Sequence, residues 1–327
     1  MRTTTEPPTP VTDRLWPAPS PALVHTLDRQ IGFDARVGER FSNHLPMELV
    51  ALDAMGADPD RLEEVLRRFV PELGPRTDTT VFDAFRAELA ADGIDATVAR
   101  HLPRFAEMPS SEWFHSMIRL AYALDAAHEG QVASALADWT AYGRVLPGEP
   151  PEGGEVPAVE VMRRLDASDL ARKGIGSDLA AVARQDTFRE AIADVVVDDD
   201  LDDLAHAVAV AHVRADSFGT LHLVTGVQAA RTVQHLLTGD ARPRFARRVV
   251  QAVLAGYGAA GEAPLPTEEE LDGLRHAEVP PWEQVRAAAV ATPDVHLTKL
   301  VYSCRTEQAA TGDPLYAWLA ARAVDLV

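Results

Sequence analysis

The chain has 327 residues, 46% of them hydrophobic, and 50 Asp and Glu residues against 31 Lys and Arg residues give it a formal charge of -19. The length allows one large or two smaller domains, and the negative charge argues against nucleic acid or an anionic membrane surface as the main partner. The single cysteine, Cys304, excludes an internal disulfide and a cysteine-based zinc site.

The first half of the chain predicts helices. Residues 1–23 are rich in proline and lack the apolar stretch of a secretion signal, so we expect a flexible segment ahead of a helical domain of residues 24–327. In "DPDRLEEVLRRFVPEL" (58–73), Asp58 is the expected N-cap and Pro59 the first helical residue. "SSEWFHSMIRLAYALDAAHEG" (110–130) predicts a helix that starts at a serine cap and ends at Gly130, and "QVASALADWTAYG" follows it.

The second half follows the same pattern. Residues 201–239 are rich in Ala, Val and Leu and predict helix with a break at Gly219, and "PRFARRVVQAVLAGYG" (243–258) is amphipathic. "ADVVVDDD" (193–200) is the best candidate for a strand. Pro- and Gly-rich loops are expected at 146–157 and 261–271. The 146–157 loop could separate two domains, but we favour one all-α domain because candidate site residues lie on both sides of it.

Common catalytic fingerprints are missing from the sequence. It contains no glycine-rich dinucleotide motif after a strand, no P-loop, no HExxH and no GxSxG. No apolar run reaches about 18 residues, so no membrane span is expected. We therefore expect a cytoplasmic protein whose chemistry, if any, depends on other groups.

Histidines are the more informative residues. Each of four lies inside a strongly apolar helical run, and one metal between helices would satisfy all four rings at once. An ordinary buried histidine bonded to a carbonyl is the alternative for each one. The four are His44, His115, His222 and His296. Three others share the Ala- and Leu-rich region, so the choice is open from pattern alone: His206, His212 and His235. The remaining four, near polar segments, are expected at the surface or in caps: His25, His101, His128 and His276.

Other polar residues near these histidines have two interpretations each. Glu48, four residues after His44, could orient that ring or be a solvated glutamate. Arg119, four residues after His115, could hold a carboxylate or a substrate oxygen or form a structural ion pair. A di-iron carboxylate bundle needs two Glu-x-x-His pairs, and Glu112–His115 is the single complete one, so this rival is disfavoured.

Four segments together resemble the questin oxidase-like family. They are "FSNHLPMELVALDAMGA", "FHSMIRLAYALDAAHEGQVASALADW", "LHLVTGVQAARTV" and "VHLTKLVYSC", and their order and rough spacing also match. The resemblance extends from about residue 28 to the C-terminus, with little signature between residues 146 and 200.

The resemblance implies a mononuclear non-haem iron, Fe(II), with O2 as cosubstrate. Its ligands would be His44, His115, His222 and His296, together with Lys299 carboxylated on its amine. A protonated lysine has no lone pair for a metal, whereas a carbamate formed from carbon dioxide is an anionic oxygen donor that a desolvated, low-pKa lysine forms more easily. Glu48 and Arg119 would then steer the substrate and its proton.

The implied activity is an oxygenase that opens a ring of an anthraquinone-type polyketide by Baeyer–Villiger-like oxygen insertion. Its expected partner is a small aromatic substrate, and the residues leave open whether NADPH is required and how many chains assemble. Two alternatives stay beside it. One is a metal-free helical ligand-binding or scaffolding protein, and the other is a metal site that binds an aromatic ligand without oxygenase activity.

Overall fold

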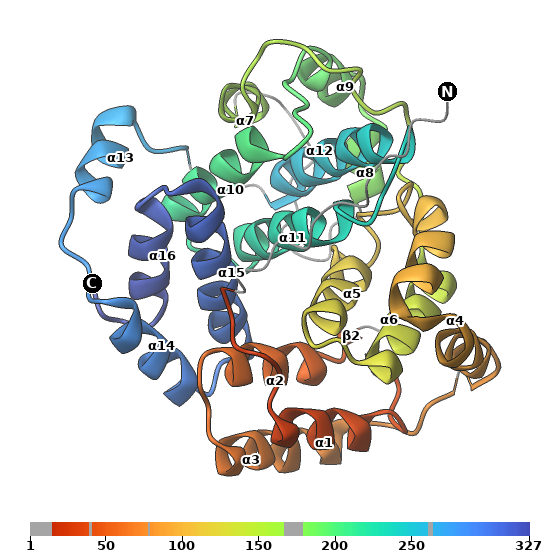
Figure 1. The fold of residues 1–327 in the computed structure, drawn as a ribbon. Coiled ribbons are helices and arrows are strands. Elements are labelled where there is room, and N and C mark those ends of the chain that lie inside the picture. The colour runs from red at the N-terminus through yellow and green to blue at the C-terminus, as the bar shows by residue number, and fades with distance from the viewer. Residues whose placement is uncertain (1–14, 39–40, 78, 167–178, 261–263) are drawn as a thin grey trace, which may run out of the picture.

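The computed structural model describes residues 15–38, 41–77, 79–166, 179–260 and 264–327, and these ranges are almost entirely helical (Figure 1). The amino-terminal half contains one two-stranded antiparallel ribbon and seven helical elements. The strands are β1 (Arg36–Val37) and β2 (Phe41–Ser42). The helices are α1 (Pro21–Gln30), α2 (Leu45–Ala54), α3 (Pro59–Phe69), the short 3-10 helix η1 (Val70–Glu72), α4 (Thr79–Phe105), α5 (His115–Asp125) and α6 (Glu129–Tyr142).

The carboxy-terminal half adds ten more helices within the described ranges. They are α7 (Ala158–Asp166), α8 (Leu179–Ala183), α9 (Asp186–Ile192), α10 (Asp202–Ala215), α11 (Phe218–Gln234), α12 (Ala241–Ala260), α13 (Glu268–Arg275), α14 (Trp282–Ala291), α15 (Val295–Thr311) and α16 (Leu315–Ala323).

Helix α11 occupies the centre of the molecule. It packs against α5, α10, α12 and α15, which surround it in Figure 1. Its residues are buried almost throughout, which explains why its sequence is apolar on all sides rather than on one stripe. Helix α2 packs against both α5 and α15 on the side of the molecule that carries α1 and α3. The ends of α2, α5, α11 and α15 are thereby brought close together.

The buried apolar side chains form one contiguous cluster that runs from Leu23 to Ala321. Helices on both sides of the 146–157 loop contribute to it, because α11 and α15 pack directly on α5 and α2. The expected all-α fold in one large helical domain is confirmed. No helix among the described residues has both the length and the apolarity needed to cross a membrane.

Several expected helix boundaries are confirmed and others are wrong. Asp58 caps α3 by accepting a hydrogen bond from the backbone N–H of Arg61. The prediction of a serine-capped helix that ends at Gly130 is wrong, since α5 starts only at His115 and Gly130 lies inside α6. The break expected at Gly219 falls at Asp216, which adopts a left-handed conformation before Ser217 caps α11.

The strand expected at 193–200 is replaced by an isolated bridge between Val195 and Val156, and the short strands β1 and β2 lie elsewhere. Of the segment 1–23 expected to be flexible, residues 1–14 lie outside the described ranges. In the remainder, the Trp16 ring stacks on Tyr302 and Ser20 caps α1. The proposed division at residue 23 therefore falls inside a helix.

Candidate metal centre

The first turns of four helices bring together the four histidines singled out from the sequence. His44 directly precedes α2, His115 begins α5, His296 is the second residue of α15, and His222 lies one turn into α11. The ring centroids are 4.8 Å apart for His44–His115, His115–His222 and His44–His296, and 5.7 Å apart for His222–His296. We call these four residues the histidine cluster.

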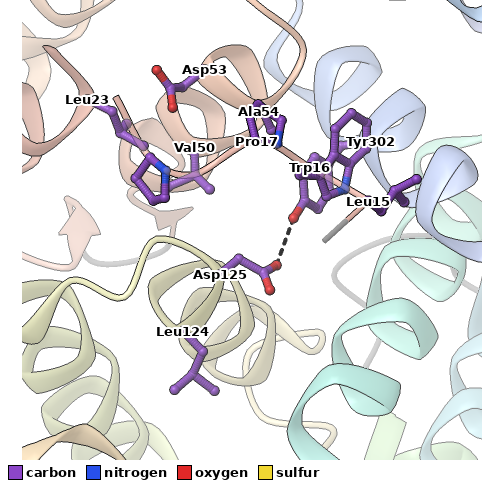
Figure 2. Close-up of a pocket in the computed structure, with 11 residues that line it drawn as sticks. Leu15, Trp16, Pro17, Leu23, Val50, Asp53, Ala54, Leu124, Asp125 and Tyr302 are labelled. Carbon is purple, nitrogen blue, oxygen red and sulfur yellow. Dashed lines mark hydrogen bonds between the residues drawn. The ribbon is translucent and has the colours of Figure 1, made fainter. Parts of the chain in front are cut away.

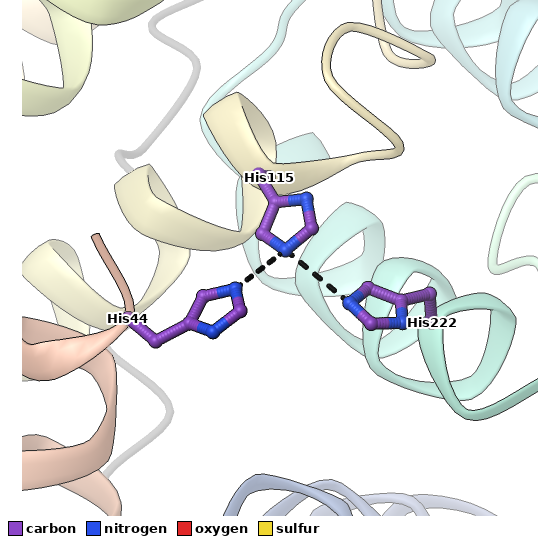
Figure 3. Close-up of side chains that lie close together, drawn as sticks. All are labelled: His44, His115 and His222. Atoms are coloured by element: carbon purple, nitrogen blue, oxygen red, sulfur yellow. Dashed lines mark hydrogen bonds between the residues drawn. The ribbon is translucent and has the colours of Figure 1, made fainter. Parts of the chain in front are cut away.

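Three rings of the cluster point the same nitrogen at one another (Figure 3). The Nε2 atoms of His44 and His115 are 2.8 Å apart, and those of His115 and His222 are 3.2 Å apart. One ligand atom from each of the three lies within 4.8 Å of the others. Rings from three separate helices thus offer a set of nitrogen donors to a single point.

In two of these rings the second nitrogen, Nδ1, already has a hydrogen-bond partner. His115 Nδ1 pairs with the carbonyl of Glu112 and His222 Nδ1 with the carbonyl of Phe218. Because a carbonyl only accepts, both Nδ1 atoms carry the proton and both Nε2 atoms present lone pairs. Two lone pairs facing each other at 3.2 Å repel, and a cation between them removes the repulsion. Histidines that bind metals in proteins commonly donate their second ring N–H to a carbonyl in this way, which fixes the orientation of the ring.

His296 stands at the edge of this group with one unused nitrogen. Its Nε2 atom is buried and has no hydrogen-bond partner, a costly state for a polar atom. Its Nδ1 atom lies 3.3 Å from Asp294. The Phe218 ring packs on both His222 and His296, with centroids 4.3 and 4.4 Å away, and is 42% exposed. A fourth nitrogen donor and an exposed aromatic ring therefore border the cluster.

A strained turn positions His115. Glu112, Trp113 and Phe114 all have left-handed φ values, of 51°, 53° and 70°. This conformation costs about 1–2 kcal/mol for each residue other than glycine. The fully buried Phe114 ring compensates by filling the space beside Gly226 of α11, where an added Cβ would lie 2.9 Å from it. Left-handed backbone at three bulky residues cannot be read from side-chain pattern, so this turn was missed.

All four histidines are held in the neutral form that binds metals. Burial is the main cause that lowers the pKa of each ring, and the positive charge of Lys299 lowers it further, as do neighbouring rings for His44, His115 and His222. The pKa falls to about 3 for His115 and to about 4 for His296, and lies well below 6.5 for His44 and His222. The cluster therefore offers lone pairs at neutral pH.

Lys299 and Glu48 form a buried pair next to the cluster. Lys299 lies one turn beyond His296 and is 2% exposed, and Glu48 is 1% exposed. Burial lowers the pKa of the Lys299 amine to about 7 against the attraction of Glu48. Burial also raises the pKa of the Glu48 carboxyl to about 7 against the attraction of Lys299. Glu48 Oε2 has no hydrogen-bond partner. Burial thus brings the pKa values of both groups close to neutral pH, each from its own side.

Arg119 contacts the loop that carries His44. Its Nη2 atom donates to the carbonyls of Ala35 and Asn43, at 2.7 and 2.8 Å, and to the Ser42 hydroxyl at 3.0 Å. The side chain is 2% exposed. These bonds fasten the segment between β1 and α2, and with it the approach of His44. Among the described residues, Glu48 and His44 share no hydrogen bond, so the predicted orienting contact is not formed.

The remaining histidines lie apart from the cluster. His212 is buried and pairs with the Thr220 hydroxyl, and His128 caps α6 as expected. Glu112, needed for the di-iron alternative, forms an ion pair with Arg36 at 2.7 Å and is not part of the cluster. Tyr302 donates to Asp125, and both residues line a cavity.

Comparison with protein families finds a match to the model described as questin oxidase-like, over residues 73–304. This stretch is well over half of the chain, and it contains His115, His222, His296 and Lys299. It is shorter than the resemblance expected from the motifs and leaves out His44 and Glu48, which the fold places at the same site. No curated protein matches the chain.

Proposed function

Because the chain belongs to the questin oxidase-like family, we propose that it is an iron-dependent oxygenase of aromatic polyketide metabolism. In this proposal it cleaves one ring of an anthraquinone-type substrate by Baeyer–Villiger-like insertion of oxygen. The observation that carries it is the convergence of imidazole nitrogens from separate helices, with the Nε2 lone pairs of His115 and His222 facing each other at 3.2 Å. Bundle cores commonly build metal sites in this way.

The donor set suits ferrous iron. Neutral imidazoles bind Fe(II) well, and one anionic oxygen partly offsets its charge. His44, His115, His222 and His296 would supply the nitrogens, and Lys299 carrying a carboxyl group would supply the oxygen. When bound, ferrous iron activates dioxygen, which no side chain does alone.

The burial of Lys299 supports its proposed carboxylation. The neutral amine attacks carbon dioxide through its lone pair, a carbon–nitrogen bond forms, and one proton leaves the nitrogen. In this proposal Glu48, whose buried Oε2 has no hydrogen-bond partner, takes that proton. The product is an anionic carbamate in place of an ammonium. The group next to the histidines would then attract a metal cation, whereas the ammonium would repel it.

Arg119 and Phe218 have separate roles in this proposal. Arg119 positions the loop before His44, since its bonds all go to that loop. The exposed Phe218 ring, which packs at an angle against His222 and His296, offers an aromatic substrate a flat surface at the edge of the site. Stacking there would hold the substrate ring beside the histidines with little loss of side-chain freedom.

Metal analysis of the purified protein tests the proposal. We expect about one iron per wild-type chain and a loss of most of it in His222→Ala. The matched control is His235→Ala, which removes the same side chain at the other end of α11 and should retain iron. Equal iron content in the two variants would contradict the assignment of the iron site to the histidine cluster. Oxygen uptake with hydroxylated anthraquinones then separates an oxygenase from a protein that only binds an aromatic ligand.

A further inference from the structure

A cavity of about 280 Å³ lies at the far ends of the helices that carry the histidines (Figure 2). Helices α2 and α5 begin at the histidine cluster and end at this cavity, where α2 contributes Val50, Asp53 and Ala54 and α5 contributes Leu124 and Asp125. With a rise of 1.5 Å per residue, the two sites are separated by about 15 Å along α5. Asp125 thus lies well away from the histidines, whereas the lining residue Tyr302 on α15 is one turn beyond Lys299.

Asp125 presents a carboxylate to this space. Its side chain is exposed, yet the surrounding protein raises its pKa to about 6 through burial. The exposed surface of Asp125 faces the cavity, whose wall includes residues of several segments (Figure 2). The carboxylate is therefore accessible to a ligand and still surrounded by protein. One oxygen, Oδ2, accepts the Tyr302 hydroxyl at 2.8 Å, which fixes the orientation of the carboxylate.

The electrostatic character of the cavity is negative. Two helix C-termini meet there, and neither α2 nor α5 has a basic residue in its last turn, although cations are favoured at that position. Asp53 and Asp125 add two carboxylates, and the lining residues include neither lysine nor arginine. Asp53 is engaged by the backbone N–H and hydroxyl of Ser20, so Asp125 is left as the acceptor for a ligand.

The rest of the wall is aromatic and apolar. The Trp16 ring stacks on Tyr302 with centroids 4.8 Å apart and planes 11° apart, and its Nε1–H donates to Thr306 at 3.1 Å. Pro17, Leu23 and Val50 complete this side. A ligand that fits must combine a positive group with an apolar or aromatic body.

We propose that this cavity binds a small molecule that carries a protonated amine on an aromatic body, with the ammonium group at Asp125. The lining supplies the carboxylate, the two helix C-termini and the aromatic wall that such a molecule needs, and its described residues include no lysine or arginine. This inference is independent of the proposed iron site, because none of the cluster histidines lines the cavity.

Calorimetric titration with three matched probes tests the proposal at mildly alkaline pH. The probes are 2-phenylethylamine, the neutral 2-phenylethanol and the anionic 3-phenylpropionate. We expect one amine per chain to bind, and the other two probes to bind at least about tenfold more weakly, the scale of one charge-assisted hydrogen bond. Asp125→Asn keeps an acceptor for Tyr302 and should abolish the preference for the amine.

Asp95→Asn, at an exposed position on α4, is the control because it removes the same charge far from the cavity. It should bind the amine as the wild type does. The proposal is overturned if the wild type binds the three probes equally or binds no amine. It is also overturned if Asp125→Asn retains the preference, or if Asp95→Asn loses it to the same degree, since the effect would then reflect net charge alone.

Discussion

Substitution of Gly226 by alanine tests whether the strained turn before His115 depends on a tight contact with α11. The Phe114 ring lies against Gly226, and an added Cβ would be 2.9 Å from Phe114 Cγ and 3.2 Å from its Cβ. Across the ring, a Cβ at Gly256 would lie 3.6 Å from Phe114 Cε2 and Cζ. The ring therefore has little room to retreat, and the residue after it is His115.

The expected magnitude follows from two opposing effects. Alanine in a helix interior is favoured over glycine by about 1 kcal/mol, whereas overpacking a filled core costs about 1–3 kcal/mol. For Gly226→Ala the two nearly cancel or leave a loss of up to about 2 kcal/mol. Gly273, exposed within α13, has no atom within 4 Å of an added Cβ, so Gly273→Ala should gain about 1 kcal/mol.

Urea unfolding gives the stability of both variants, and metal analysis gives the state of the site. We expect Gly226→Ala to be less stable than Gly273→Ala by about 1–3 kcal/mol and to hold less iron, because a displaced Phe114 moves His115. If the two variants gain stability alike and Gly226→Ala retains its iron, the contact does not position the histidine.

Three further expectations concern other residues. Phe218→Ala should weaken binding of a hydroxylated anthraquinone by about 1 kcal/mol, the scale of an aromatic pair, with iron content unchanged. Fluorescence titration measures this, and unaltered binding would remove Phe218 from the site. Protein loaded with diamagnetic Zn²⁺ and supplied with isotope-labelled carbon dioxide should show a carbamate carbon resonance that is lost in Lys299→Met, and its absence at full zinc occupancy would exclude the modification. Burial lowers the pKa of His212 to about 4, whereas the unfolded ring titrates near 6.5. Between these values only the unfolded chain takes up the proton, so stability falls by up to about 3 kcal/mol as pH drops from 6.5 to 4. His212→Gln should lose that share of the pH dependence in urea titrations, and an unchanged slope would show that His212 does not cause it.

Much of the fold was predictable because helix signals are local. The Asp58–Pro59 start of α3 and the amphipathic run that became α12 depend on residues within one or two turns. The boundaries at His115 and Asp216 were not predictable, because both involve left-handed residues that no propensity favours. At His115 the turn depends on packing against a distant segment, Phe114 on Gly226.

For the site, sequence pattern selected the histidines, but it could not rank them. His212 lies in an equally apolar run, yet its ring pairs with Thr220 and is not part of the cluster. What separates it from His222 is the placement of α5 and α2 around α11, a property of the whole fold. The contact between Asp125 and Tyr302 could not be predicted from pattern, since the two residues are far apart in sequence.

The direction of α2 and α5 links the two sites. Both helices begin at the histidine cluster and end at the cavity, so their positive ends face the histidines and their negative ends face Asp53 and Asp125. The positive ends help to keep the histidines neutral and favour an anion, such as a carbamate on Lys299 or a deprotonated phenol of the substrate. The negative ends favour a cation at the cavity. One pair of parallel dipoles thus assigns opposite charge preferences to two sites about 15 Å apart, and an anionic aromatic should be recognised at the first site and rejected at the second.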